Sequence, residues 1–258
     1  MPQPHEGIND KVVELLDDLG RRQRWWRSEA RKTGMRPKEL ASSVDERSAH
    51  ELRWGLKLFF PGDGIVGEEL PPENESADRT WIVDPLDGSR NFAHGLALWG
   101  ISVALVVDDR PVLGVYHLPD VRETFVVTRG EGAWFNGERL QARKWGALDE
   151  GDMVSVGGLD VPEPLRRGAL RRLGCAGAEL CYLAAGRLAA VHLGGARLWD
   201  VATAALVAQE AGCTAGFLDG GELWPWSPRA PLSNRTLVAW APGVADPRGG
   251  ARHGTPSA

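Results

Sequence analysis

The run Asp84-Pro85-Leu86-Asp87-Gly88-Ser89 holds two carboxylates close together in a loop stiffened by proline. Unpaired carboxylates at this spacing repel each other, and a hard divalent cation relieves that repulsion by taking oxygen ligands. The amides of Gly88 and Ser89 would also bind a phosphate if a helix begins there. Such turns are common on surfaces, but this one lies between apolar Trp81-Ile82-Val83 and Asn91-Phe92. The flanking residues favour two acids at the mouth of a core strand.

Two further acids stand where secondary-structure elements are predicted to end or begin. Ile65-Val66-Gly67 has the composition of a short strand and leads into Glu68. Asp200 precedes the helical run 201–207, which places this acid at or next to the N-terminus of a helix. Oxygen donors are therefore available from three separate parts of the chain.

Three segments of the chain resemble the signature segments of the inositol monophosphatase family. They are Gly67-Glu68-Glu69, the run from Trp81 to Phe92, and Leu198-Trp199-Asp200-Val201-Ala202. Supporting matches are His94-Gly95-Leu96, Gly114-Val115-Tyr116, Gly130-Glu131-Gly132-Ala133, Asn136-Gly137 and Glu210-Ala211-Gly212. The similarity runs from about Ser42 to Ala241, and the three segments in this order are highly specific.

The resemblance implies a mixed α/β fold, a layered α-β-α-β-α sandwich, in one phosphatase domain over residues 1–258. Its N-terminal half, 1–148, would carry Glu68 and the acidic loop, and its C-terminal half, 149–242, would carry Asp200. Residues 243–258 are rich in Gly, Pro and Arg and are expected to form a flexible tail. The family also implies a homodimer.

The resemblance further implies two or three Mg²⁺ ions, with Asp84 bridging two of them and Glu68 also orienting the attacking water. The implied metal ligands are Glu68, Asp84, the Leu86 carbonyl, Asp87 and Asp200.

Other residues at positions that match the family are implied to act in catalysis and substrate binding. Ser89 stands where the family usually has threonine and keeps the hydroxyl that positions the water, while Ser42 and Asp45 occupy the family's Thr-x-x-Asp segment. The expected catalytic residues are thus Glu68, Ser89, Asp45 and Ser42. The expected substrate contacts are Asp87, Gly88, Ser89, Arg90, Leu193 and Asp200.

The chemistry of phosphate monoester hydrolysis agrees with this set of residues. The dianion repels hydroxide, so hydrolysis needs clustered positive charge, a polarised water and stabilisation of the leaving alkoxide. Paired magnesium ions supply all three without a covalent intermediate, and ligands that are all oxygen favour magnesium over zinc. The predicted activity is a metal-dependent phosphoric monoester hydrolase that acts on a small phosphorylated molecule.

Leu193 departs from the family at the position where inositol-specific members carry a glutamate that contacts ring hydroxyls. An apolar side chain cannot accept such a hydrogen bond, which argues against free inositol phosphate. Arg90 and the run 94–100 resemble the histidinol-phosphate phosphatase branch, although that branch tends to keep the glutamate. Histidinol phosphate, or a sugar, cyclitol or nucleoside monophosphate of specialised metabolism, is the expected substrate, with inositol 1-phosphate as the alternative.

Three other interpretations compete with this one. Cys181 and Arg187 match the Cys-x5-Arg spacing of cysteine-dependent phosphatases, but the apolar, Ala-rich sequence around Cys181 favours a core helix. His94 follows the acidic loop, and a packed or hydrogen-bonded histidine is favoured over a site residue. A catalytically inactive binding or regulatory homologue would keep the fold without activity, but it would be expected to lose a carboxylate, and all four acids are present.

Composition sets the class of protein. The chain has 258 residues, 43% of them hydrophobic, a net charge of −5 and a pI near 5.7, so it can bury a substantial core and shows no basic groove for nucleic acid. Its start lacks the pattern of a secretory signal, and no apolar run reaches the roughly 20 residues of a membrane span. A soluble cytoplasmic protein is expected. The three cysteines contain no CxxC pair and are expected to be buried thiols.

The elements that must position these acids follow from periodicity. Apolar residues from Ile8 to Leu19 recur at helical spacing and predict a helix that runs into Trp25-Trp26. Ser43 with Glu46 matches a capping box, which predicts a second helix starting there with Asp45 in its first turn.

The remaining chain is predicted to form further strands and helices. Residues 101–107, 112–117 and 124–128 are predicted to form an antiparallel meander. The second half is predicted to alternate, with a strand at 153–156, a helix near 164–172 and a helix after Asp200.

Overall fold

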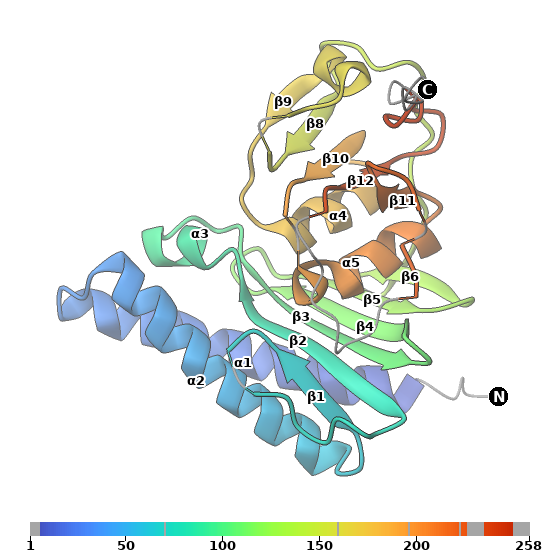
Figure 1. Ribbon diagram of the computed structural model, residues 1–258. Coiled ribbons are helices and arrows are strands. Elements are labelled where there is room, and N and C mark those ends of the chain that lie inside the picture. The colour runs from blue at the N-terminus through green and yellow to red at the C-terminus, as the bar shows by residue number, and fades with distance from the viewer. Residues whose placement is uncertain are drawn as a thin grey trace, which may run out of the picture.

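Two β-sheets alternate with helical layers in this computed structural model, which describes residues 6–69, 71–158, 160–195, 197–221, 223–225 and 235–249 (Figure 1). The first half of the chain forms α1 Glu6–Lys32, α2 Pro37–Phe59, β1 Gly64–Gly67, β2 Arg79–Asp87, α3 Ser89–His94, β3 Gly100–Val107, β4 Arg110–Leu118, β5 Glu123–Thr128, β6 Gly132–Phe135 and β7 Glu138–Leu140. The second half forms β8 Met153–Val156, the 3-10 helix η1 Glu163–Arg167, β9 Ala169–Arg171, α4 Ala176–Ala184, β10 Ala190–Leu193, α5 Leu198–Glu210, β11 Thr214–Phe217 and β12 Leu237–Trp240. The fold class is mixed α/β, as predicted.

A hairpin of α1 and α2 covers one face of the first sheet (Figure 1). The α1 helix buries Val12, Leu16 and Leu19 at helical spacing against this sheet, and it extends beyond Trp25-Trp26 to Lys32. The helical prediction for this segment is confirmed.

The start of α2 differs from the prediction. The helix begins at Pro37, whose fixed φ suits a first helical position, and Arg36 precedes it in an extended conformation. Ser43 therefore lies inside the helix rather than at its N-cap, and Asp45 lies well beyond the first turn. The capping-box pattern was misleading because the same spacing also occurs within helices.

The seven strands β1 to β7 form one sheet in sequence order, here called sheet A. The β1 and β2 strands are parallel, and the following strands form the predicted antiparallel meander. In the register of β2 against β3, Asp84 is opposite Ser102 and Asp87 is opposite Gly100, with a bulge between these two pairs. The strand thus continues past Asp84 and bends at the acidic loop, because a bulge re-aims the side chains that follow it.

The second sheet, here called sheet B, has the strand order β11-β12-β10-β8-β9 and mixes parallel and antiparallel pairs. The α4 and α5 helices lie between the two sheets, and one cluster of buried residues extends from sheet A through both helices to sheet B (Figure 1). The helix predicted near 164–172 is wrong. Only η1 forms, and Gly168 then lies against the Asp152 carbonyl and leads into β9.

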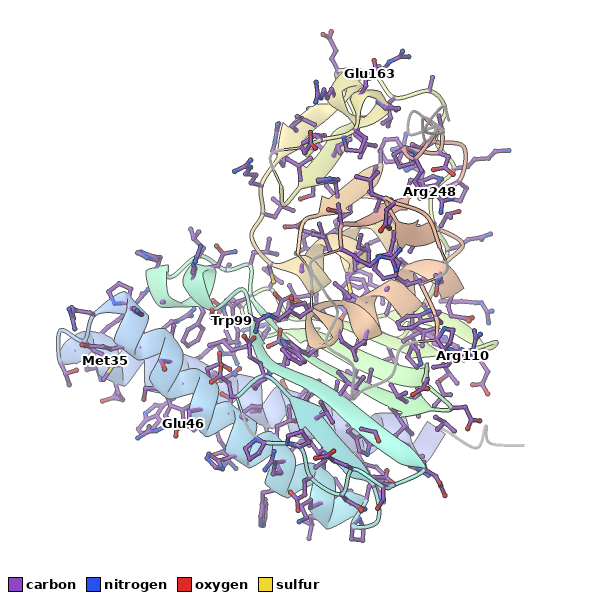
Figure 2. The ribbon with its side chains drawn as sticks, in the orientation of Figure 1. Met35, Glu46, Trp99, Arg110, Glu163 and Arg248 are labelled. Carbon is purple, nitrogen blue, oxygen red and sulfur yellow. The ribbon has the colours of Figure 1, made fainter. Side chains whose placement is uncertain are left out.

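The outer face of sheet B carries less helix than a full α-β-α-β-α sandwich. Within the described ranges, only the short η1, marked by Glu163 in Figure 2, forms a helix beyond this sheet. Part of the expected tail is ordered against the sheet: Val244 is buried, and the Arg248 guanidinium lies 4.8 Å from the Trp240 ring centre (Figure 2). Residues 250–258 of the expected tail lie outside the described residues. No described helix is long and apolar enough to cross a membrane.

Candidate active site

A cleft of about 520 Å³ opens where the ends of β1 and β2 meet the N-terminal ends of α3, α4 and α5. Most of the predicted site residues line it, although they come from both halves of the chain. They are Asp45, Glu68, Asp84, Leu86, Asp87, Gly88, Ser89, Arg90, Leu193 and Asp200. Ser42 is the exception, because it is exposed on α2 and is not one of the residues that line the cleft.

The α1–α2 hairpin holds the turn that follows Asp84 in place. The Leu86 amide donates to Asp84 Oδ1 at 2.9 Å, which closes a tight turn around proline. Gln23 of α1 is fully buried and donates from Nε2 to the Pro85 carbonyl at 2.7 Å and to the Ser48 hydroxyl at 2.9 Å. Gln23 is a positioning residue that sequence reasoning missed, since a polar residue inside an amphipathic helix gives no local signal of its partner.

Gly88 connects the acidic loop to α3, which begins at Ser89. Its φ of 76° is left-handed, and a Cβ there would lie 3.0 Å from Cys175 Sγ, so only glycine suits this position. Asn91 fixes α3 by donating to the Leu98 and Leu173 carbonyls, each at 2.8 Å. A helix start therefore stands directly after Asp87, as the phosphate-cradle interpretation requires.

Asp87 is the last residue of β2 and is buried against the start of α4. Its Oδ2 accepts hydrogen bonds from the Tyr116 hydroxyl and the Gly177 amide, both at 2.7 Å, and its Oδ1 accepts the Ala176 amide at 3.2 Å. Asp87 thereby joins sheet A to α4. Tyr116 was not foreseen, because an aromatic residue in a core strand is ordinarily a packing residue.

Asp200 and Glu68 meet at the start of α5. Asp200 Oδ2 accepts the Arg197 amide at 2.9 Å in a capping box, which confirms the predicted position of this acid at a helix start. Glu68 follows β1 and accepts hydrogen bonds from the Arg197 guanidinium and from Trp199 Nε1, the latter at 3.1 Å. The sequence pointed to this segment, but not to the contact with Glu68.

Burial and mutual repulsion raise the pKa values of Asp84 and Asp45 in the cleft. Burial raises the pKa of Asp84 well above its usual range, and the charges of Asp87, Asp200 and Asp45 raise it further. Burial raises the pKa of Asp45 to about 8, with Glu69 and Glu68 adding to it.

Burial also acts on Asp200 and Asp87, and hydrogen bonds oppose it. Burial raises the pKa of Asp200 to about 7, and the Arg197 amide opposes this shift. Burial also raises the pKa of Asp87, against the effect of the Tyr116 hydroxyl. The cleft therefore disfavours negative charge unless a positive charge enters it.

Glu179 is a sixth acid in the wall of the cleft, and the sequence patterns did not point to it. Its Oε1 accepts the amides of Gly174 at 3.0 Å and Cys175 at 3.4 Å, which fixes the turn before α4. Its Oε2 is buried without a hydrogen-bond partner, and burial raises its pKa to about 7. An acid within an apolar helical run gave no sign of its position at the cleft.

The residues of the cleft fit a hard divalent cation in charge and donor type. All donors are oxygens, the carboxylates repel one another, and Asp45 Oδ1 is buried without a partner. Among the described residues, however, no three His, Cys, Asp or Glu side chains already form a metal-holding group. Glu68 is turned to Arg197, so binding of a cation requires this side chain to move, whereas Asp87 stays bonded to the amides of α4.

Two of the competing interpretations, those of Cys181 and His94, lack support from the geometry. Cys181 is buried in α4 and burial raises its pKa well above the usual range, while Arg187 pairs with Glu123 at 2.7 Å, so these two residues form no anion-binding thiolate loop. His94 is exposed in the last turn of α3 and is not among the residues lining the cleft. The three cysteines are buried and free, as predicted.

Comparisons with known proteins give a consistent result. A family model described as the inositol monophosphatase family matches residues 21–249. A fructose-1,6-bisphosphatase/inositol-1-monophosphatase of Thermotoga maritima is 33% identical over 210 residues, covering 79% of this chain and 80% of that protein. A histidinol-phosphatase of Chlorobaculum parvum is 42% identical over 97 residues, covering 37% of this chain and 38% of that one. The crystal structure of the extragenic suppressor protein suhB from Bartonella henselae superposes with a TM-score of 0.77 at 25% identity, covering 92% of this chain and 95% of that chain.

Proposed function

Because the chain belongs to the inositol monophosphatase family of phosphoric monoester hydrolases, we propose that it hydrolyses a small phosphate monoester with Mg²⁺ and water. The observation that carries this proposal is the group of buried acids with raised pKa values in one cleft, directly before the helix start at Ser89. Such a group is costly to keep charged, and a divalent cation turns that cost into binding free energy.

The proposed metal ligands are those that the family resemblance implies. Bound Mg²⁺ would supply positive charge and a polarised water, and the residues that would hold two or three ions are Glu68, Asp84, the Leu86 carbonyl, Asp87 and Asp200. Glu68 must leave Arg197 to take this role. Asp45, whose Oδ1 has no partner, lies close enough to the acids to add negative charge to the site.

The remaining proposed site residues orient the substrate and the water. The amides at the start of α3, from Gly88 and Ser89, would bind the phosphate, and the Ser89 hydroxyl would hold the water for in-line attack. Arg90 lines the cleft beside them and would contact an anionic oxygen of the substrate. No protein nucleophile is needed, so no covalent intermediate is proposed.

The substrate is proposed to present an apolar or aromatic face to Leu193. This side chain is 4% exposed and lines the cleft, so it offers the leaving group an apolar wall. An imidazole or nucleobase, as in histidinol phosphate or a nucleoside monophosphate, fits this wall better than a ring of hydroxyls. A sugar or cyclitol monophosphate of specialised metabolism is proposed beside these two, with inositol 1-phosphate as the alternative. The similarity to a protein named histidinol-phosphatase supports histidinol phosphate.

The wider setting is proposed from the family and the composition. We propose a cytoplasmic homodimer in one domain that acts without a nucleic-acid partner. A catalytically inactive regulatory homologue is the alternative from another class of function.

One experiment tests activity and substrate together. Purified protein is stripped with chelator and then assayed for phosphate release with and without Mg²⁺. The substrates are histidinol phosphate, inositol phosphates, sugar phosphates and nucleoside monophosphates. Activity that is lost on chelation and restored by Mg²⁺ supports the proposal, and the preferred substrate identifies the leaving group. Full activity in chelator, or no turnover of any phosphate by a protein that binds Mg²⁺, would contradict it.

A further inference from the structure

Tyr116 reaches from the middle of sheet A to the proposed metal ligand Asp87. The tyrosine is fully buried, and its hydroxyl lies 2.7 Å from Asp87 Oδ2 and 3.2 Å from Cys175 Sγ. The hydroxyl can donate one proton, and the carboxylate is the stronger acceptor of the two. Tyr116 therefore donates to Asp87 and can accept from the thiol.

Two glycines leave the space that the tyrosine ring fills. A Cβ at Gly100, opposite Asp87 in the sheet, would lie 2.6 Å from the Tyr116 hydroxyl oxygen. A Cβ at Gly177, in the first turn of α4, would lie 2.2 Å from Tyr116 Cε2 and 2.9 Å from Asp87 Oδ2. The tyrosine, the aspartate and the two glycines thus form one fitted unit between sheet A and α4, which any side chain at either glycine would disrupt.

The two oxygens of Asp87 are used unequally. Oδ2 accepts both short bonds, from Tyr116 and from the Gly177 amide, and is held on opposite sides by the sheet and the helix. Oδ1 accepts the longer bond, 3.2 Å from the Ala176 amide. Without the tyrosine hydroxyl, only the two amides of α4 would hold the carboxylate, and the carboxylate would rotate more freely.

We propose that Tyr116 is a positioning residue for metal binding: its hydroxyl fixes Asp87 Oδ2, so that Oδ1, which accepts only the 3.2 Å bond from the Ala176 amide, keeps a lone pair for a divalent cation in the cleft. The inference rests on the proposed function, because it takes Asp87 as a metal ligand. Hydrogen bonds that orient metal ligands commonly change metal affinity by about 10–100-fold when removed. A purely structural role would instead change the stability of the metal-free protein and leave the affinity alone.

The test compares two single-atom deletions. Tyr116→Phe keeps the ring and removes the hydroxyl, and Tyr182→Phe makes the same change at the other tyrosine of the chain, which lies against Arg187. Mg²⁺ is titrated by calorimetry into the metal-free wild type and both variants. Tyr116→Phe is expected to raise the Kd for Mg²⁺ about tenfold or more, while Tyr182→Phe keeps the wild-type Kd. Urea unfolding in chelator measures the structural contribution separately.

The same substitution made in Asp87→Asn protein shows whether Tyr116 changes the Mg²⁺ affinity through Asp87. In Asp87→Asn protein, Tyr116→Phe is expected to leave the remaining Mg²⁺ affinity unchanged, because the residue through which it acts has lost its charge. An unchanged or tighter Kd in Tyr116→Phe alone, or an equal weakening in both backgrounds, would overturn the role of Tyr116. Failure of the wild type to bind Mg²⁺ would instead overturn the proposed function itself.

Discussion

Arg197 and Glu68 form an ion pair that joins the end of β1 to the start of α5 at the cleft. Both side chains are partly exposed, and Trp199 donates a further hydrogen bond to the same carboxylate. Glu68 is also a proposed metal ligand, so the guanidinium and the metal ion compete for it. Metal binding by Glu68 would therefore require this carboxylate to leave the guanidinium.

Removal of the competing cation is expected to tighten metal binding. Arg197→Ala frees Glu68 and removes a positive charge from the cleft, while the backbone amide that caps Asp200 remains. An exposed ion pair contributes about 0.2–1 kcal/mol, so the Kd for Mg²⁺ should fall by roughly 1.4- to fivefold. Calorimetric titration measures this, with Arg36→Ala, whose partner Glu39 lies on the surface of α2, as the control. Weaker binding in Arg197→Ala would show that the arginine supports the metal site.

Replacement of the central acid is expected to abolish turnover without loss of the fold. Asp84→Asn removes a charged ligand from the buried group and should lower kcat by at least about a thousandfold. The metal-free variant should be as stable as the wild type or more stable, because a neutral amide replaces an acid whose charge is disfavoured by burial. Circular dichroism and phosphate-release kinetics test both points. Asp109→Asn, at an exposed turn, is the control, and near-normal kcat in folded Asp84→Asn would remove Asp84 from the mechanism.

The metal-free protein is expected to lose stability as pH rises. Burial raises the pKa of Asp45 from 3.8, the value of an unperturbed aspartate, to about 8, so the folded state binds more protons than the unfolded state between these two pH values. The stability that protonated Asp45 contributes to the fold is fully present below about pH 4 and is lost as the pH rises through 8. Asp200, at about 7, acts in the same direction. From pH 6 to 8 the free energy of unfolding should fall on the order of 2 kcal/mol from Asp45 alone.

Urea unfolding in chelator at several pH values measures this slope. Saturating Mg²⁺ should flatten it, because the ion replaces the protons that the acids otherwise hold. Asp45→Asn should also flatten it in the absence of metal. A slope that is the same in Asp45→Asn as in the wild type would show that Asp45 titrates normally.

Leu193 is expected to set the preference for the leaving group. Leu193→Glu adds a carboxylate acceptor to the wall of the cleft, where it can bind a ring hydroxyl. The ratio of kcat/KM for inositol 1-phosphate to kcat/KM for the best substrate should rise roughly tenfold, which corresponds to one hydrogen bond of about 1.4 kcal/mol. Leu193→Met, which keeps the wall apolar, should leave the ratio near that of the wild type. An unchanged ratio in folded, metal-binding Leu193→Glu would place Leu193 outside the leaving-group contacts.

The sequence by itself determined the family, the fold class and the order of the acids along the chain. Asp84 and Asp87 could be placed at a strand end because apolar residues precede them and a Gly-Ser step follows. Asp200 could be placed at a helix start because a helical run follows it. These are local relationships, set by backbone conformation over a few residues. The helix start at Asp200 is found in the structure, and β2 ends at Asp87 after continuing past Asp84.

Sequence patterns predicted the wrong element boundary or type where another feature of the chain favoured a different structure. Ser43 and Glu46 matched a helix start, but Pro37 begins the helix because its φ is already helical. The arginine-rich run after Pro164 looked helical, but pairing with β8 draws residues 169–171 into a strand. A local backbone preference decided the first case, and pairing with a neighbouring strand decided the second.

Only the tertiary structure decided which partners hold the acids. Tyr116 meets Asp87 and Arg197 meets Glu68 because strands and helices far apart in the chain converge on one cleft. Gln23 reaches Pro85 for the same reason. A side chain's type shows which bonds it can form, but the identity of a distant partner depends on how the sheets and helices pack, and no spacing along the chain encodes that geometry.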